Sequence, residues 1–233
     1  MLLLAFDTAT PAVTVAVHDG TRTLASSCAV DAHRHAELLA PAIAQVLAEA
    51  GAARSDLTAV VAGVGPGPYT GLRVGVVTAR VLASTLGIPG YGVCTLDVIA
   101  AGTQQDGEYL VATDARRREV YWARYKGAER VTGPDVGKPA EVPGRELPVA
   151  GAGADMYPEA FPVRIYPKYP DAGVLAALVA GSLRAGSQGT VAGQGETAGE
   201  LQPGTTRLLP LDPLYLRRPD AREPGARKSV LKP

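Results

Sequence analysis

Two stretches of this sequence resemble each other: Leu2-Leu-Leu-Ala-Phe-Asp7 recurs as Tyr109-Leu-Val-Ala-Thr-Asp114, at an offset of 107 residues. Each is a short apolar run that ends in an aspartate. At the same offset Val13 falls on Val120, so a second strand is predicted after each copy. A strand, an aspartate, a turn and a second strand that occur twice predict two related halves, with a boundary near residues 101–107.

Outward from the first copy, the hydrophobic pattern predicts a mixed sheet covered by helices. Val13, Val15 and Val17 alternate with other residues as in a half-buried strand, and Asp19-Gly20 is a hairpin signal. This order of elements is typical of an α/β protein. The expected elements are strands at 2–6, 13–17, 23–30 and 57–64 and helices at 35–50, 70–86 and 171–185.

A weaker similarity sets Ala62-Gly-Val-Gly65 against Ala150-Gly-Ala-Gly153 and supports the same duplication. We therefore divide the chain into an N-terminal domain at 1–103, a C-terminal domain at 104–216 and a basic, flexible tail at 217–233.

The 233 residues include 23 basic and 23 acidic side chains, and 46% of them are hydrophobic. This composition excludes a disordered chain and gives no support for binding a polyanion through overall charge. Six basic residues against two acidic ones lie within 217–233, so any contact with nucleic acid is expected to be local.

The apolar run before Asp7 is five residues long, too short for a signal peptide, and no stretch approaches the ~20 apolar residues of a membrane span. A cytoplasmic protein without membrane contact is therefore expected. Cys28 and Cys94 lie in apolar surroundings without C-x-x-C spacing, so reduced, buried thiols are predicted.

The loop Gly65-Pro-Gly-Pro-Tyr-Thr-Gly71 joins an apolar strand to a helix that Thr70 could cap. Such a loop can bring backbone N–H groups to an anion, although it matches neither the P-loop nor the dinucleotide fingerprint. A rigid turn without a ligand explains it equally well. The possible nucleotide (ATP or ADP) or anion site comprises Asp7, Thr8, Gly65, Gly67, Thr70 and Gly71.

Gly71, Gly75 and Ala79 recur every four residues and form a small-residue stripe on the second helix. Glycine costs a helix interior ~1 kcal/mol relative to alanine, so close approach of another element should offset it. That element could be this chain's own sheet or the helix of a partner. The first helix carries Leu39, Ile43 and Val46 on one stripe, and Leu38 and Ala42 lie to one side of it.

Asp7 and Asp114 each end a strand, where a carboxylate can cap a turn or hold a metal–nucleotide complex. His33 and His35 have the wrong spacing for helical metal ligands, so no metal site is predicted. No nucleophile elbow or Cys–His pairing stands out, and no catalytic residue is assigned. Arg116 and Arg117 follow Asp114 in a turn and are expected to project outward.

Four segments together resemble the bacterial TsaB (YeaZ) family. They are Leu4-Ala-Phe-Asp-Thr-Ala-Thr10, Gly63-Val-Gly-Pro-Gly-Pro-Tyr-Thr-Gly-Leu-Arg-Val-Gly75, Asp114-Ala-Arg-Arg-Arg-Glu-Val-Tyr121 and Pro213-Leu-Tyr-Leu-Arg217. The resemblance implies two actin-like (ribonuclease-H-like, ASKHA) domains with mixed sheets covered by helices. It also implies a role in placing N6-threonylcarbamoyl on adenosine 37 of tRNAs that read ANN codons.

In that family the catalytic subunit is the paralogue TsaD, whose metal-binding H-x-x-x-H motif this sequence lacks. The resemblance therefore implies a non-catalytic platform without a cofactor of its own. It would form a heterodimer with TsaD, recruit the ATPase TsaE, dimerise with itself in isolation and meet tRNA indirectly. The partner surface predicted on the two helices comprises Leu38, Leu39, Ala42, Ile43, Val46, Gly71, Leu72, Gly75 and Ala79.

The segment Asp114–Tyr121, with its turn residues Asp114, Arg116 and Arg117, is expected to serve structure or partner contact rather than catalysis, because side chains in a turn project outward. Charge reversal at the two arginines should then weaken assembly with little change in melting temperature. Competing readings are a small actin-like kinase that uses Asp7 and Asp114, an M22-type metallopeptidase, and a direct tRNA binder that uses the basic tail.

Overall fold

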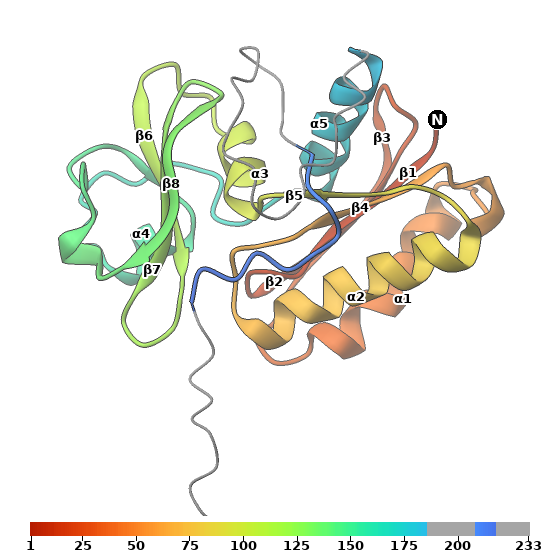
Figure 1. Ribbon diagram of the computed structural model, residues 1–233, viewed down its shortest axis with the longest axis horizontal. Helices are drawn as coiled ribbons and strands as arrows, with labels where there is room; N and C mark the ends of the chain where they lie inside the picture. The colour runs from red at the N-terminus through yellow and green to blue at the C-terminus, as the bar shows by residue number, and fades with distance from the viewer. Residues whose placement is uncertain (186–207, 218–233) are drawn as a thin grey trace, which may run out of the picture.

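The computed structural model of this chain describes residues 1–185 and 208–217, and these form two β-sheets with helices around them (Figure 1). The predicted basic tail lies, from residue 218 onward, outside the described residues. The strands are β1 (Leu3–Asp7), β2 (Ala12–His18), β3 (Thr23–Val30), β4 (Ala59–Gly63), β5 (Gly90–Val93), β6 (Glu108–Asp114), β7 (Val120–Lys126), β8 (Glu129–Gly137) and β9 (Val149–Ala150). The helices are α1 (His35–Glu49), α2 (Tyr69–Leu86), α3 (Thr95–Ala101), α4 (Ala152–Met156) and α5 (Ala172–Arg184), with 3-10 turns at Arg54–Asp56 and Pro139–Glu141.

The first sheet has the order β3-β2-β1-β4-β5, in which β1, β4 and β5 are parallel and the β2–β3 hairpin is antiparallel. Helices α1 and α2 cover one face, and α5 covers the other (Figure 1). Side chains alternate accordingly: Leu4 and Phe6 of β1 pack toward α1 and α2, whereas Leu3 and Ala5 pack toward α5. Strand β2 is buried along its whole length rather than half-buried, because it lies between β1 and β3 under both α1 and α5.

The second sheet, β8-β7-β6-β9, repeats the arrangement of the first. Strand β6 pairs with β7 in antiparallel fashion and with β9 in parallel, as β1 does with β2 and β4. Asp7 and Asp114 end equivalent strands. The weaker similarity is also confirmed, since β4 and β9 end at Gly63 and Ala150, within the two matching segments. The internal repeat is therefore a property of the fold.

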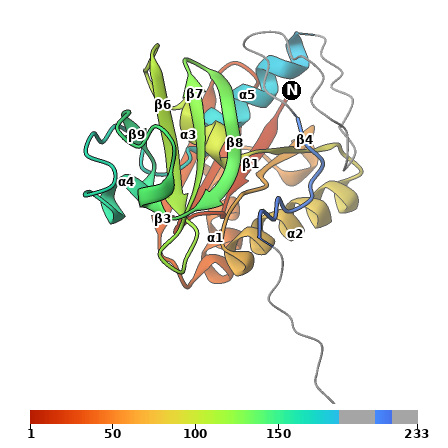
Figure 2. The same cartoon turned by 60° about the vertical axis from the view of Figure 1, so that its left-hand side comes forward.

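The two halves share elements. Helix α3 lies between the sheets, with Val98 packed toward α5 and Ile99 packed toward β6 and β7 (Figure 2). Helix α5, from the predicted second domain, packs on the first sheet. Residues 208–217, which we call the C-terminal strap, pair with β5 through Leu209 and then run toward the turn between β6 and β7 (Figure 1). The strands of the two sheets lie on either side of the predicted boundary at 103/104. Helix α5 does not follow that boundary, so the division into domains stays a prediction.

Two smaller expectations are wrong. Cys94 is a buried free thiol as predicted, but Cys28 is exposed because β3 is the edge strand of its sheet. Thr70 does not cap α2: that helix begins at Tyr69 after Pro68, so Thr70 lies within its first turn with its side chain exposed. The predicted stop at Gly87 is confirmed by its left-handed backbone, φ 65°.

Candidate functional site

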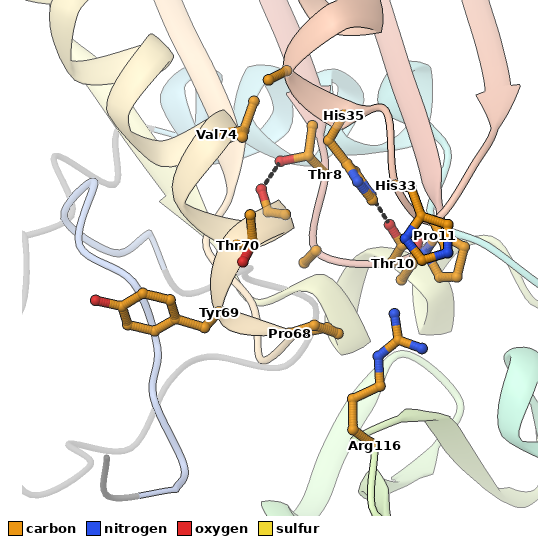
Figure 3. Close-up of a pocket in the computed structure, with 14 residues that line it drawn as sticks. Thr8, Thr10, Pro11, His33, His35, Pro68, Tyr69, Thr70, Val74 and Arg116 are labelled. Carbon is orange, nitrogen blue, oxygen red and sulfur yellow. Dashed lines mark hydrogen bonds between the residues drawn. The ribbon is translucent and has the colours of Figure 1, made fainter. Parts of the chain in front are cut away.

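Loops from both halves meet near the carboxyl ends of β1 and β4. The β1–β2 loop, the start of α1 with the loop before it, the first turn of α2 and the β6–β7 turn enclose a cavity of about 330 Å³. Arg116 reaches into it from the second half, and His33 and His35 line it from the side of α1 (Figure 3). A second cavity of about 410 Å³ adjoins the first, with which it shares Pro68, Tyr69 and Arg116. Sites at the carboxyl ends of parallel strands are common places for ligands, because the loops there converge.

Asp7 serves the local turn. Its carboxylate accepts hydrogen bonds from the Ala9 N–H and the Thr95 hydroxyl, both at 2.7 Å. Burial raises the pKa of Asp7 despite these two hydrogen bonds. Gly63 stands beside the carboxylate, where any side chain would collide with it. Asp7 lines neither cavity, so of the two roles left open by the sequence, capping a turn is the one seen.

Asp114 has the equivalent role in the second half. It accepts the Arg116 N–H at 2.7 Å, as Asp7 accepts the N–H two residues further on, and its other oxygen lies 3.2 Å from the Arg116 guanidinium. The Asp114 side chain is 9% exposed. Reversing the charge of Arg116 would place a second carboxylate beside the buried Asp114. At Arg116 we therefore expect a loss of stability instead of an unchanged melting temperature.

The glycine-rich loop approaches its own chain closely. A side chain at Gly67 would meet the Ala9 carbonyl, and the Gly65 N–H donates to the Thr95 hydroxyl at 3.2 Å. These contacts fit the interpretation of the loop as a rigid turn. Of the six residues proposed for a nucleotide, Thr8, Thr70 and Gly71 line the first cavity and Gly67 lines the second, whereas Asp7 and Gly65 line neither.

The small-residue stripe of α2 faces inward. The Thr8 hydroxyl donates to the Gly71 carbonyl at 2.7 Å (Figure 3). The same hydroxyl accepts from the Gly75 N–H at 2.9 Å. A side chain at Gly75 would overlap that hydroxyl, and Ala79 is fully buried. Placing this stripe on a partner surface is therefore wrong, because the close approach is made by the β1–β2 loop of the same chain.

Most of the other predicted interface residues also lie inside. Leu39, Ile43, Val46 and Leu72 are buried within the chain, and only Leu38 and Ala42 stay partly open to solvent. The outward face of α2 instead carries Val77 and Val81, which are 52% and 57% exposed. The sequence contained this signal, since Tyr69, Arg73, Val77 and Val81 follow one another at four-residue spacing.

The second cavity combines aromatic and cationic side chains that sequence reasoning did not bring together. It is lined by Tyr69, Tyr121, Tyr215, Arg116, Arg117 and Arg217, which we call the Tyr–Arg pocket. Tyr69 stacks on Tyr215 with ring centroids 5.5 Å apart, and the Arg73 guanidinium lies 4.2 Å from the Tyr69 ring. The C-terminal strap thus completes a cavity formed by both halves.

A buried polar cluster joins α3 to the second sheet. Asp97 accepts the Tyr125 hydroxyl at 2.7 Å and lies 3.5 Å from the Arg130 guanidinium, which also contacts the Cys94 sulfur. Burial raises the pKa of Asp97, against the effect of Arg130, and it raises the pKa of Cys94 to about 12. The cluster holds the halves together and leaves Cys94 unreactive.

Within residues 1–185 and 208–217, no three His, Cys, Asp or Glu side chains gather closely enough to hold a metal ion. In the same ranges, no helix has the length and apolar character that crossing a bilayer requires.

Comparison with known proteins assigns the family. A family model described as TsaD: tRNA N6-adenosine threonylcarbamoyltransferase matches residues 29–182. The solved structure of YeaZ from Pseudomonas aeruginosa is 31% identical and superposes with a TM-score of 0.71, covering 80% of this chain and 93% of that one. The chain belongs to the TsaB/YeaZ branch of the TsaD family. Its α/β, actin-like fold class is thereby confirmed.

Two curated relatives are similar to this chain, and the second of them is named TsaB. An uncharacterized protein of Mycobacterium tuberculosis is 45% identical over 225 residues, covering 94% of this chain and 93% of its own length. The tRNA threonylcarbamoyladenosine biosynthesis protein TsaB of Escherichia coli is 38% identical over 139 residues, which are 55% of this chain and 57% of that protein.

Proposed function

We propose that this chain is a non-catalytic partner subunit in the biosynthesis of threonylcarbamoyladenosine on tRNA. Its place in the TsaB/YeaZ branch supports that pathway, since relatives in this branch are named for it. In this proposal the chain forms a heterodimer with TsaD, recruits TsaE and meets tRNA indirectly, through the complex, in the cytoplasm. Alone, the chain forms a homodimer through the surface with which it binds TsaD.

The observation that carries the proposal is the outward face of α1 and α2. Val77 and Val81 place two branched apolar side chains on adjacent turns of α2, each more than half exposed. Leu38 and Ala42 of the neighbouring α1 are partly exposed, and they pack against the core between the first sheet and helices α1 and α2. Covering such a surface with another protein removes apolar area from water, which stabilises the complex by about 25 cal/mol per Å² before the costs of association.

Two features support a role without intrinsic catalysis. The full sequence lacks the H-x-x-x-H motif by which TsaD holds its metal. The carboxylates of Asp7 and Asp114, which a kinase of this fold would use, are both engaged with N–H groups of their own turns. A carboxylate engaged in this way rigidifies the turn, as expected for a structural platform.

The test is co-purification with the TsaD of the same organism, followed by threonylcarbamoyl transfer to tRNA. The double variant Val77→Glu/Val81→Glu should fold normally but lose both self-association and TsaD binding, because it places charges in an apolar interface. Val131→Glu is the matched control, since Val131 is 46% exposed on β8 of the other half.

Three outcomes would count against the proposal. If the double variant still dimerises and still binds TsaD, the helix-face interface is wrong. If this chain transfers threonylcarbamoyl without TsaD, the non-catalytic role is wrong. ATP turnover by the purified chain that disappears in Asp7→Asn favours the kinase instead.

A further inference from the structure

The Tyr–Arg pocket lies at one end of the outward stripe of α2, since Tyr69 belongs to both, and it does not include Val77 or Val81. It opens beside the first turn of α2, and its walls come from that turn, from the β6–β7 turn and from the C-terminal strap. At about 410 Å³ it falls within the range of cavities that hold small ligands or single residues of a larger one.

The lining of the pocket includes the hydroxyl of Tyr121. Tyr121 is 7% exposed, and among the described residues its hydroxyl has no hydrogen-bond partner. Burial and the neighbouring Asp114 raise its pKa, so the hydroxyl keeps its proton and can donate. The hydroxyl itself is open to solvent, so a ligand in the cavity can reach it.

The lining is rich in arginine. It includes Arg116, Arg117 and Arg217, and among the described residues no acidic side chain lines it. Glu119 pairs with Arg217 from outside the lining, as Asp114 pairs with Arg116. The Ala115 carbonyl also accepts from Arg217 at 3.4 Å, which holds the guanidinium against the β6–β7 turn. Pre-positioned arginines of this kind suit a phosphate, whose oxygens they can bind in pairs.

Aromatic rings supply the second half of the recognition chemistry. Tyr69 and Tyr215 are 53% and 42% exposed although they stack on each other, and Arg73 holds the Tyr215 hydroxyl at 2.9 Å. Flat rings held rigidly beside guanidinium groups are the surface on which unstacked bases of single-stranded RNA are bound. An acidic peptide would use the arginines but would leave the rings without a flat partner.

We propose that the Tyr–Arg pocket binds one nucleotide of a single-stranded RNA segment, with its base against the tyrosines and its phosphate on Arg116 and Arg217. The Tyr121 hydroxyl, which also lines the pocket, donates to the base or to the phosphate. This inference deepens the proposed function and rests on it, since it gives the platform a direct contact with the RNA that is being modified.

The experiment measures binding of a fluorescein-labelled, unstructured RNA 12-mer to the purified full chain by anisotropy, over a range of salt concentrations. Arg217→Gln should weaken binding about tenfold and lower the slope of log K against log salt by about 0.7, the value of one phosphate contact on a single strand. Tyr121→Phe keeps the packing and the charge, so it should weaken binding about fivefold with the slope unchanged.

Arg54→Gln is the matched control, because it removes the same charge from an exposed turn outside the pocket. Equal losses in Arg54→Gln and Arg217→Gln would show attraction by overall charge and overturn the pocket. Wild-type binding by both folded pocket variants, checked by circular dichroism, overturns it as well.

Two competitors test the ligand class. A polyglutamate peptide should compete poorly; if it displaces the RNA as well as unlabelled RNA does, the pocket is a site for acidic protein. Free AMP should compete only at much higher concentration, because it lacks the neighbouring phosphates, and AMP binding as tight as RNA binding overturns the RNA assignment.

These measurements use the chain alone, so they are separable from the TsaD test. Pocket-dependent RNA binding without support of transfer would reject only the proposed function. Full support of transfer by variants that also bind RNA normally would reject only the pocket.

Discussion

Replacing Gly75 with alanine should destabilise the protein, although alanine is the better helix former. A side chain there would lie 2.5 Å from the Thr8 hydroxyl oxygen, well inside van der Waals contact. That oxygen is held from two sides, because it donates to the Gly71 carbonyl and accepts from the Gly75 N–H. The hydroxyl must therefore either move and lose both hydrogen bonds or stay and be compressed.

The magnitude follows from three contributions. Two buried hydrogen bonds contribute about 2 kcal/mol together, and forcing an extra methyl group into a packed site typically costs about 1–3 kcal/mol. The helix propensity of alanine returns about 1 kcal/mol. The first two costs do not both apply in full, because a Thr8 side chain that moves away loses its hydrogen bonds but relieves the overlap. We therefore expect a net loss of about 1–3 kcal/mol in the free energy of unfolding.

The assay is urea unfolding of Gly75→Ala, followed by far-ultraviolet circular dichroism and by the fluorescence of Trp122. Gly181→Ala in α5 is the matched control, because an added side chain at Gly181 meets no described residue within 4 Å. That control should gain about 0.5–1 kcal/mol. The same substitution in two helices is thus expected to act with opposite signs.

A double-mutant cycle isolates the cause. In a Thr8→Ala background the obstructing oxygen is gone, so Gly75→Ala should become stabilising, as it is at Gly181. If Gly75→Ala stabilises the protein with Thr8 present, or destabilises it equally when Thr8 is alanine, the reasoning about the inward-facing stripe is refuted.

Further predictions concern protons, thiols and a helix cap. Because burial raises the Asp7 pKa above 3.8, the folded protein holds that proton more tightly than the unfolded chain, and the resulting stabilisation is lost as pH rises through the raised pKa. The urea concentration at the unfolding midpoint should therefore fall less with rising pH in Asp7→Asn than in the wild type. An equal fall in both proteins would show that other groups cause the pH dependence. A thiol reagent should modify exposed Cys28 but spare buried Cys94 in the native protein, and Cys28→Ser should abolish native labelling. Asp171→Ala removes the side chain that accepts the Val174 N–H, so unfolding should become easier by about 1 kcal/mol in urea titrations, whereas no change would deny the cap.

Local pattern was sufficient for most of the architecture. The strand and helix order of the first half follows from hydrophobic spacing, because a strand buried on one or both faces and an amphipathic helix have different periods. The equivalence of Asp7 and Asp114 followed from comparing the chain with itself, since a duplicated fold preserves its strand ends. The stop of α2 at Gly87 followed from the backbone freedom of glycine.

The candidate site was less predictable. Spacing on α2 groups Gly71, Gly75 and Ala79 on one face, but spacing does not say whether that face meets the chain or a partner. The answer depends on Thr8, which is more than sixty positions away and enters the stripe through the β1–β2 loop. The error about partner contacts arose there.

The repeated α/β halves and the strand-ending aspartates followed from local periodicity and recurring segments, and the family followed from the resemblance of four motifs. Which faces are covered and which side chains share a cavity depends instead on how distant segments pack. Tyr69, Tyr121 and Tyr215 are separated by 52 and 94 positions and come from a helix, a strand and the C-terminal strap. Their meeting depends on long-range packing, for which a linear pattern carries no signal.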